Sequence, residues 1–230
     1  AQEGGADRVE LCAGIPEGGT TPSYGEIKTA RRVLTTTRLH VIIRPRGGDF
    51  LYSPLELERM AADIDIAREL GADGVVFGCL RPDGSLDTEA NAMLMEHAKG
   101  LSVTFHRAFD RCADPRKALE ELIAQGFDRI LTSGQQPTAL EGTPLLKELH
   151  EQANGRIILL AGCGVNEQNI ATIAQATAIH EFHFSARTAV KSKMMFSNPD
   201  LYMGAKDADE DTLNITSAER VANTIAQLCK

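Results

Sequence analysis

Three side chains with catalytic or binding chemistry follow an apolar stretch in VTFHRAFD, residues 103–110. The first three residues of the stretch suit a β-strand, and His106, Arg107 and Asp110 come after them. An imidazole can transfer protons near neutral pH, and a guanidinium can bind an anion. The stretch therefore predicts a catalytic or ligand-binding position. The alternative is structural, with His106 bonded to a neighbour and Arg107 paired with Asp110.

A second group of candidates lies in RPRGGDF, residues 44–50. Arg44 and Arg46 flank a proline, and the two glycines that follow allow the backbone to approach a ligand closely. Because arginine forks fit carboxylate or phosphate, both arginines are candidate anion ligands. For Arg46 an ion pair with Asp49 that stabilises the turn explains the pattern about as well.

Two short loops rich in small residues follow the last two apolar runs, AGCGV at 161–165 and FSAR at 184–187. Loops at this point of a β/α barrel commonly hold phosphate through backbone N–H groups and a helix N-terminus. A tight turn without a ligand is the competing interpretation. The anion-binding candidates here are Gly162, Gly164, Ser185 and Arg187.

The elements that must position these residues alternate between strand and helix. Helical patterns with capping residues lie between the apolar runs, for example from Ser53 to Gly71, from Asp114 to Gly126, and from Asn166. Such alternation is typical of a parallel sheet covered by helices. The apolar runs lie at 8–12, 40–46, 74–79, 102–107, 129–134, 157–163 and 181–185.

We therefore expect an α/β TIM (β/α)8 barrel forming one domain over residues 1–230. Only seven strands are visible, and the chain opens with what looks like the tail of a helix, so we expect the first barrel strand to be missing before Ala1. An open doubly wound sheet is the alternative, which the lack of a GxGxxG motif disfavours. Residues 186–215 predict a lid or an irregular excursion, and 217–229 a last helix.

Side-chain alternation along the strands sorts the candidates by face. Val9 and Leu11 should meet the helices, so Glu10 should point into the barrel. The residues expected to meet at the C-terminal mouth are Glu10, Arg44, His106 and His183. We take Glu10, His106 and His183 as candidate catalytic residues. Arg44 is expected to hold Glu10 ionised, with Glu10 or a backbone carbonyl fixing the tautomer of His106.

Composition limits the classes of function. The chain has a net charge of −8 and no tryptophan, which argues against a nucleic-acid binder. It has no apolar run of about 18 residues, which argues against a membrane span. Its five cysteines are odd in number and form no CxxC motif, which suggests reduced thiols in the cytoplasm.

Three of the cysteines, Cys12, Cys79 and Cys163, fall at the ends of apolar runs. Soft thiolates select Cu(I) or zinc, so these positions are candidate metal ligands. Taken alone, each is more often a small buried apolar residue.

Six segments together resemble the copper homeostasis protein CutC family: GGADRVELC, EGGTTPSYG, IRPRGGDFLYS, VTFHRAFD, LTSGQ and EFHFSAR. The resemblance implies a cytoplasmic, often oligomeric TIM barrel with a role in copper homeostasis. It also implies Cu(I) on cysteines near the first two strands. Cys12 matches the cysteine of the second strand, whereas relatives carry the first-strand cysteine before the position of Ala1.

Two functions are therefore expected. One is a copper homeostasis protein that binds Cu(I), with Cys12 as a metal ligand. The other is a TIM-barrel enzyme that acts on a small anionic or phosphorylated substrate, with His106 and Glu10 as acid and base. The expected partners are a metal ion or a small anionic ligand and further copies of the chain, but neither nucleic acid nor a membrane.

Overall fold

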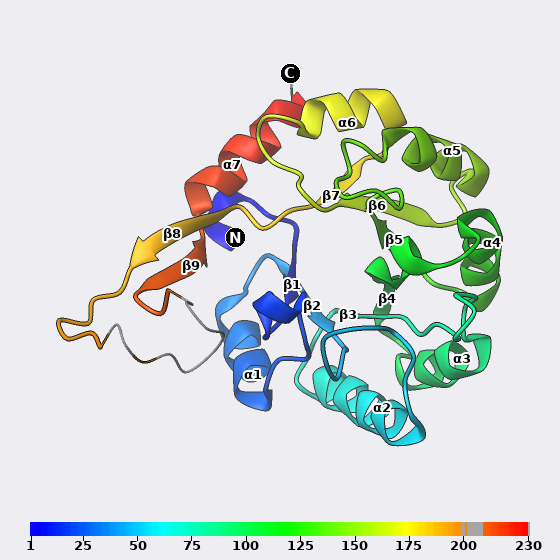
Figure 1. The fold of residues 1–230 in the computed structure, drawn as a ribbon, viewed down its shortest axis with the longest axis horizontal. Helices are drawn as coiled ribbons and strands as arrows, with labels where there is room; N and C mark the ends of the chain where they lie inside the picture. The colour runs from blue at the N-terminus through cyan, green and yellow to red at the C-terminus, as the bar shows by residue number, and fades with distance from the viewer. Residues whose placement is uncertain (199–200, 202–208, 230) are drawn as a thin grey trace.

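The computed structural model describes residues 1–198, 201 and 209–229. Seven parallel strands form one sheet, and each strand is bonded to its neighbour in chain order. The sheet curls into a barrel-like core, as predicted (Figure 1). The strands are β1 (Arg8–Leu11), β2 (Arg38–Ile42), β3 (Gly74–Phe77), β4 (Ser102–Phe105), β5 (Arg129–Thr132), β6 (Ile158–Gly162) and β7 (Glu181–His183).

Helices surround the curled sheet on its outer side (Figure 1). Ser23 and Ser53 each form a capping box at a helix start, which satisfies N–H groups that the helix itself leaves free. The helix expected from Asn166 begins at Ile170 instead. The α-helices are α1 (Tyr24–Val33), α2 (Pro54–Glu69), α3 (Thr88–His97), α4 (Pro115–Gln125), α5 (Thr143–Ala153), α6 (Ile170–Thr177) and α7 (Ala218–Ala226). The 3-10 helices are η1 (Gln2–Gly4), η2 (Ile15–Glu17), η3 (Arg107–Arg111) and η4 (Gln227–Cys229).

Strand alternation places apolar residues under the helices and polar residues inside the barrel, as the sequence predicted. Val103 and Phe105 of β4 belong to the hydrophobic core. Thr104, between them, is buried but lies on the other face of the strand. Val9 and Leu11 of β1 likewise pack against the core. The inner face is therefore free to carry polar side chains toward the barrel mouth.

An ionic cluster that sequence reasoning missed fills part of the barrel interior. The Glu181 carboxylate on β7 accepts bonds from Arg8 Nη2 on β1 at 2.6 Å and from Arg129 Nε on β5 at 2.8 Å. Arg129 Nη1 also donates to Ser102 Oγ at 2.7 Å. Burial, with the charges of Arg8 and Arg129, lowers the pKa of nearby His40 to about 3. Three strands are therefore joined by one carboxylate.

The edges of the sheet are β1 and β7, which do not pair with each other. Side chains span the space between them instead. Arg8 meets Glu181, and further along the strands Glu10 Oε2 lies 3.5 Å from His183 Nε2. The helix α7 packs on η1 nearby, where a Cβ added to buried Gly4 would lie 2.5 Å from the carbonyl oxygen of Ala218.

The segment expected to be a lid or an irregular excursion contains a two-stranded ribbon. β8 (Arg187–Lys191) pairs antiparallel with β9 (Thr212–Thr216), and the ribbon extends away from the barrel (Figure 1). Val190, Leu213 and Ile215 expose apolar surface on it. Thr212, Ile215 and Thr216 of β9 are β-branched, which was the local indication of a strand.

The ionic cluster yields a prediction about stability. Glu181→Gln leaves Arg8 and Arg129 without their shared carboxylate, so the free energy of unfolding should fall by about 2 kcal/mol. The matched variant Glu121→Gln removes a surface partner of Lys117 and should change it by less than about 0.5 kcal/mol. Urea denaturation at pH 7 measures both values.

The pH dependence of this effect has a defined sign. Burial acts to raise the pKa of Glu181, but the bonds from Arg8 and Arg129 outweigh it and lower the pKa. The stabilisation is therefore present above the pKa of the unfolded state and is lost as the pH falls through the folded value. A difference between wild type and Glu181→Gln that grows as the pH falls through the acidic range would contradict this assignment.

Candidate ligand site at the barrel mouth

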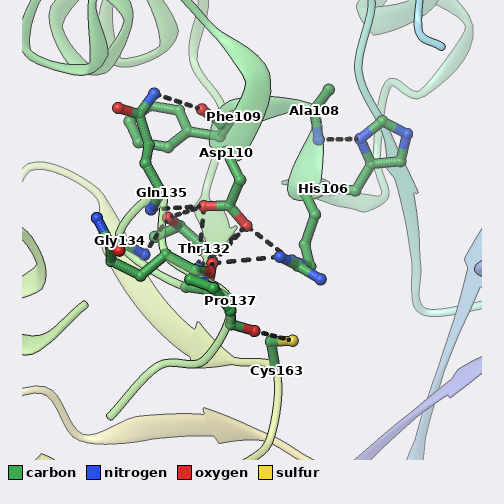
Figure 2. Close-up of polar contacts among 12 residues, drawn as sticks. His106, Ala108, Phe109, Asp110, Thr132, Gly134, Gln135, Pro137 and Cys163 are labelled. Atoms are coloured by element: carbon green, nitrogen blue, oxygen red, sulfur yellow. Dashed lines mark hydrogen bonds and ion pairs between the residues drawn. The ribbon is translucent and has the colours of Figure 1, made fainter. Parts of the chain in front are cut away.

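His106 follows β4 and begins η3, where its ring takes part in the turn. The Nδ1 atom accepts a hydrogen bond from the backbone N–H of Ala108 at 3.2 Å (Figure 2). The remaining ring proton must therefore reside on Nε2, because Nδ1 supplies its lone pair to the backbone. His106 is only 3% exposed, and Nε2 has no partner among the described residues.

The buried ring of His106 is neutral. Burial, followed by the charge of Arg44, lowers its pKa to about 3. At physiological pH the Nε2–H group is thus a fixed hydrogen-bond donor rather than a group that titrates. The expectation that His106 titrates near neutral pH is not met, and the tautomer is fixed by an N–H group rather than by Glu10 or a carbonyl.

Arg44 extends from the end of β2 and is buried to all but 5% of its surface. Its Nη1 donates to the carbonyl oxygens of Glu17 and Gly19 at 2.7 and 2.9 Å, and Nη2 donates to that of Gly48 at 3.0 Å. The Nε–H group has no partner in the described structure. Arg44 therefore ties two loops together, and the predicted pairing with Glu10 is wrong because Glu10 meets His183 instead.

Two aromatic residues of the loop after β2 complete this cluster, and sequence reasoning missed both. The Phe50 ring lies 4.8 Å from the His106 ring and 5.1 Å from Arg44 Cζ. The hydroxyl of Tyr52 is buried without a partner in the described residues, and burial raises its pKa. Their position in the loop that carries the two glycines was the available indication.

Arg46 contacts residues of its own loop and of the next helix. Its Nε donates to Glu56 Oε1 at 2.6 Å, and its Nη1 lies 3.0 Å from Asp49 Oδ1. The guanidinium also lies 5.3 Å from the centre of the Tyr52 ring. The turn-stabilising alternative therefore describes the geometry of Arg46, while its role as an anion ligand stays a prediction.

Cys12 lies just beyond β1, two residues after Glu10, and its side chain is partly exposed. Burial, followed by the charge of Glu10, raises the pKa of its thiol to about 11, although Arg187 acts in the opposite direction. Within the described residues no group of three or more His, Cys, Asp or Glu side chains is arranged to hold a metal ion. The predicted metal role of Cys12 would therefore need ligands of another kind or from elsewhere.

Asp110 has a structural role, which was the alternative interpretation of VTFHRAFD in the sequence. Its carboxylate accepts bonds from Thr132 Oγ1 at 2.6 Å, from the backbone N–H groups of Ser133 and Gln135, and from Arg107 Nε at 2.7 Å (Figure 2). An anion enclosed by backbone N–H groups in this way fixes a turn. The carboxylate therefore holds the loop after β5 in place rather than facing a ligand.

The loops after β6 and β7 enclose a cavity of about 210 Å³. Gly164, Ser185 and Arg187 line it, in agreement with their predicted location. Gly162 lies outside the lining, and a Cβ there would be 2.5 Å from Leu131 Cδ1. A larger hollow of about 610 Å³ lies between β1 and α1, away from the mouth and mostly apolar.

Together, the fold and the mouth define a TIM-barrel-type α/β protein with buried polar groups at its strand ends and a cavity at the loops after β6 and β7. Residues 1–188 match the model of the CutC family. A CutC family protein of Bacteroides thetaiotaomicron is 67% identical over 98% of this chain and 91% of its own length. The chain belongs to the CutC family.

Two further comparisons agree with this assignment. The human copper homeostasis protein cutC homolog is 48% identical over 99% of this chain and 84% of its own length. The crystal structure of CutC from Streptococcus agalactiae superimposes with a TM-score of 0.75 at 42% identity, covering 77% of this chain and 87% of that chain. No helix in the described part of the chain has the length and apolar character needed to cross a membrane.

The buried histidines yield a prediction. His40 and His106 should keep neutral rings from pH 8 down to about pH 4, with Nε2 protonated in His106. Nitrogen-detected NMR of the histidine rings measures both properties, and His106→Asn assigns the signal. Since each folded-state pKa lies below the unfolded value, stability should also decrease as the pH falls from about 6.5 toward 3. A His106 signal that titrates between pH 5 and 8 would contradict the assignment.

Proposed function

We propose that this protein acts in copper homeostasis by binding Cu(I). The names of its relatives support the general role, since the human relative is called a copper homeostasis protein homolog. The observation that supports a direct role is Cys12, a partly exposed thiol at the mouth beside the Glu10–His183 pair. Thiolate is the soft donor that Cu(I) prefers.

The environment of Cys12 imposes a condition on this function. With its pKa raised to about 11, the thiol is protonated at neutral pH. Cu(I) must therefore displace a proton from the thiol. At pH values below the pKa, the apparent affinity for Cu(I) should rise by about tenfold for each unit by which the pH is raised. Arg187, which lowers the pKa of the same thiol, favours the metal-binding form.

Cu(I) titration against a competing chelator tests the proposal. Cys12→Ser should weaken binding by at least about tenfold, because it removes the thiolate ligand. Cys163→Ser is the matched control, since Cys163 is also a partly exposed thiol at a strand end but donates to the carbonyl of Pro137. Equal affinity of wild type and Cys12→Ser would remove Cys12 from the site.

A second candidate function is supported by a different observation. The buried Nε2–H of His106 has no acceptor in the described structure, although an unpaired buried donor costs about 1–3 kcal/mol. A ligand oxygen would satisfy it. We propose as the alternative an enzyme that acts on a small anionic substrate, with His106 as a neutral donor and Glu10 as the base.

A metabolite screen by thermal shift and binding calorimetry tests this alternative. His106→Gln, which retains an N–H donor, should keep part of the affinity for any anionic ligand found. His106→Ala should lose at least about tenfold in affinity, because the donor is gone. If His106→Ala lowers the melting temperature but binds the ligand as tightly as wild type, His106 is a structural residue.

We further propose a cytoplasmic location and a homo-oligomeric state. The four cysteines whose side chains are described are all free thiols, as suits a reducing compartment. The apolar surface of Val190, Leu213 and Ile215 on the ribbon suits contact with another copy. Sedimentation velocity measures the assembly state.

A further inference from the structure

The cavity between the loops after β6 and β7 has the size and walls of an anion site. Its volume of about 210 Å³ is room for about seven water molecules. The walls come from residues 164–167, residues 184–187, and Arg220 and Thr224 of α7. We propose that this cavity binds the phosphate group of a small phosphate monoester.

The first support is a set of backbone donors. No hydrogen bond within the described part of the chain takes up the backbone N–H of Gly164, Ser185 or Ala186. Gly164 and Ala186 have φ angles of 73° and 44°, a conformation in which successive N–H groups can point to one side of the chain. Donors from two loops suit a tetrahedral oxyanion, which presents oxygens in several directions.

The second support is the distribution of charge. Arg220 is fully engaged: its Nε and Nη2 each lie 3.1 Å from a Glu167 oxygen, and its third nitrogen donates to the carbonyl of Arg187. Glu167 therefore balances Arg220. Arg187 lines the cavity, and its charge also acts on the Cys12 thiol. Because Glu167 balances Arg220, Arg187 is the cation that a ligand in the cavity would meet.

The ligand class follows from these walls. A carboxylate has two oxygens and would leave several of the donors unused, whereas a phosphate monoester has three terminal oxygens and about two negative charges. A nucleic-acid backbone is disfavoured by the net charge of −8.

This inference deepens the second candidate function, because it names the substrate class of that mouth. It does not depend on Cu(I) binding or on turnover. A phosphate site would remain measurable if Cys12→Ser had no effect on copper, and it would remain in His106→Ala if His106 were the catalytic donor. Failure of either proposed function is therefore distinguishable from failure of this site.

Calorimetry of the full chain with inorganic phosphate and with glycerol 3-phosphate tests the site. We expect both to bind, the monoester at least as tightly, and Arg187→Gln to weaken both by at least tenfold. Arg38→Gln is the matched control, because Arg38 is an exposed arginine at the opposite end of the barrel. It should change affinity by less than twofold.

A second measurement uses the backbone. The amide resonances of Gly164 and Ala186 should shift on addition of phosphate, while those of Gly100 and Gly126 in distant turns should not. Three results would overturn the proposal: no binding at millimolar phosphate, equal losses in Arg187→Gln and Arg38→Gln, or phosphate binding without monoester binding. The last would indicate a closed site for a free anion.

Discussion

One carboxylate links the two sides of this open sheet. Glu181 on β7 accepts bonds from Arg8 on β1 and from Arg129 on β5. Because β1 and β7 share no backbone hydrogen bonds, their relative position depends on side chains. Two cations around one partly buried carboxylate form a stable arrangement only when all three groups are present. The mouth depends on this linkage, since Glu10 and His183 are brought together on the same two strands.

Much of the fold follows from short-range patterns. Seven apolar runs, Ser and Asp caps and glycine stops predicted the strands and most helices, because local sequence determines them directly. The exception was the β8–β9 ribbon, whose strands are mostly exposed and lack the apolar runs that mark the barrel strands. The interior cluster was also missed, since Arg8 and Arg129 stand at the starts of strands, where charge usually indicates solvent.

The sequence predicted on which face of a strand each candidate site residue lies, but not which groups that residue contacts. Alternation put Glu10 and His183 on faces that meet, because the period of a strand is fixed, while the meeting of all four candidates in one cavity stays a prediction. It could not show that Arg44 would bind carbonyl groups of two loops, or that Ala108 would set the tautomer of His106. Such partners come from turns, whose geometry depends on contacts far apart in the sequence.

The polar groups of this molecule fall into two sets, those with hydrogen-bond partners and those without. Asp110 and Glu181 are as polar as the mouth residues, yet neighbouring N–H or O–H groups occupy their carboxylates. Arg44 and His106 are buried to a similar degree and each keeps one donor unpaired in the described structure. Stability alone would favour pairing such donors with acceptors or replacing the residues with apolar ones. Unpaired buried atoms also occur on His40, Asp63 and Gln125, so the lack of a partner does not by itself mark a ligand site. What distinguishes Arg44 and His106 is their position at the C-terminal ends of strands, where barrels bind ligands.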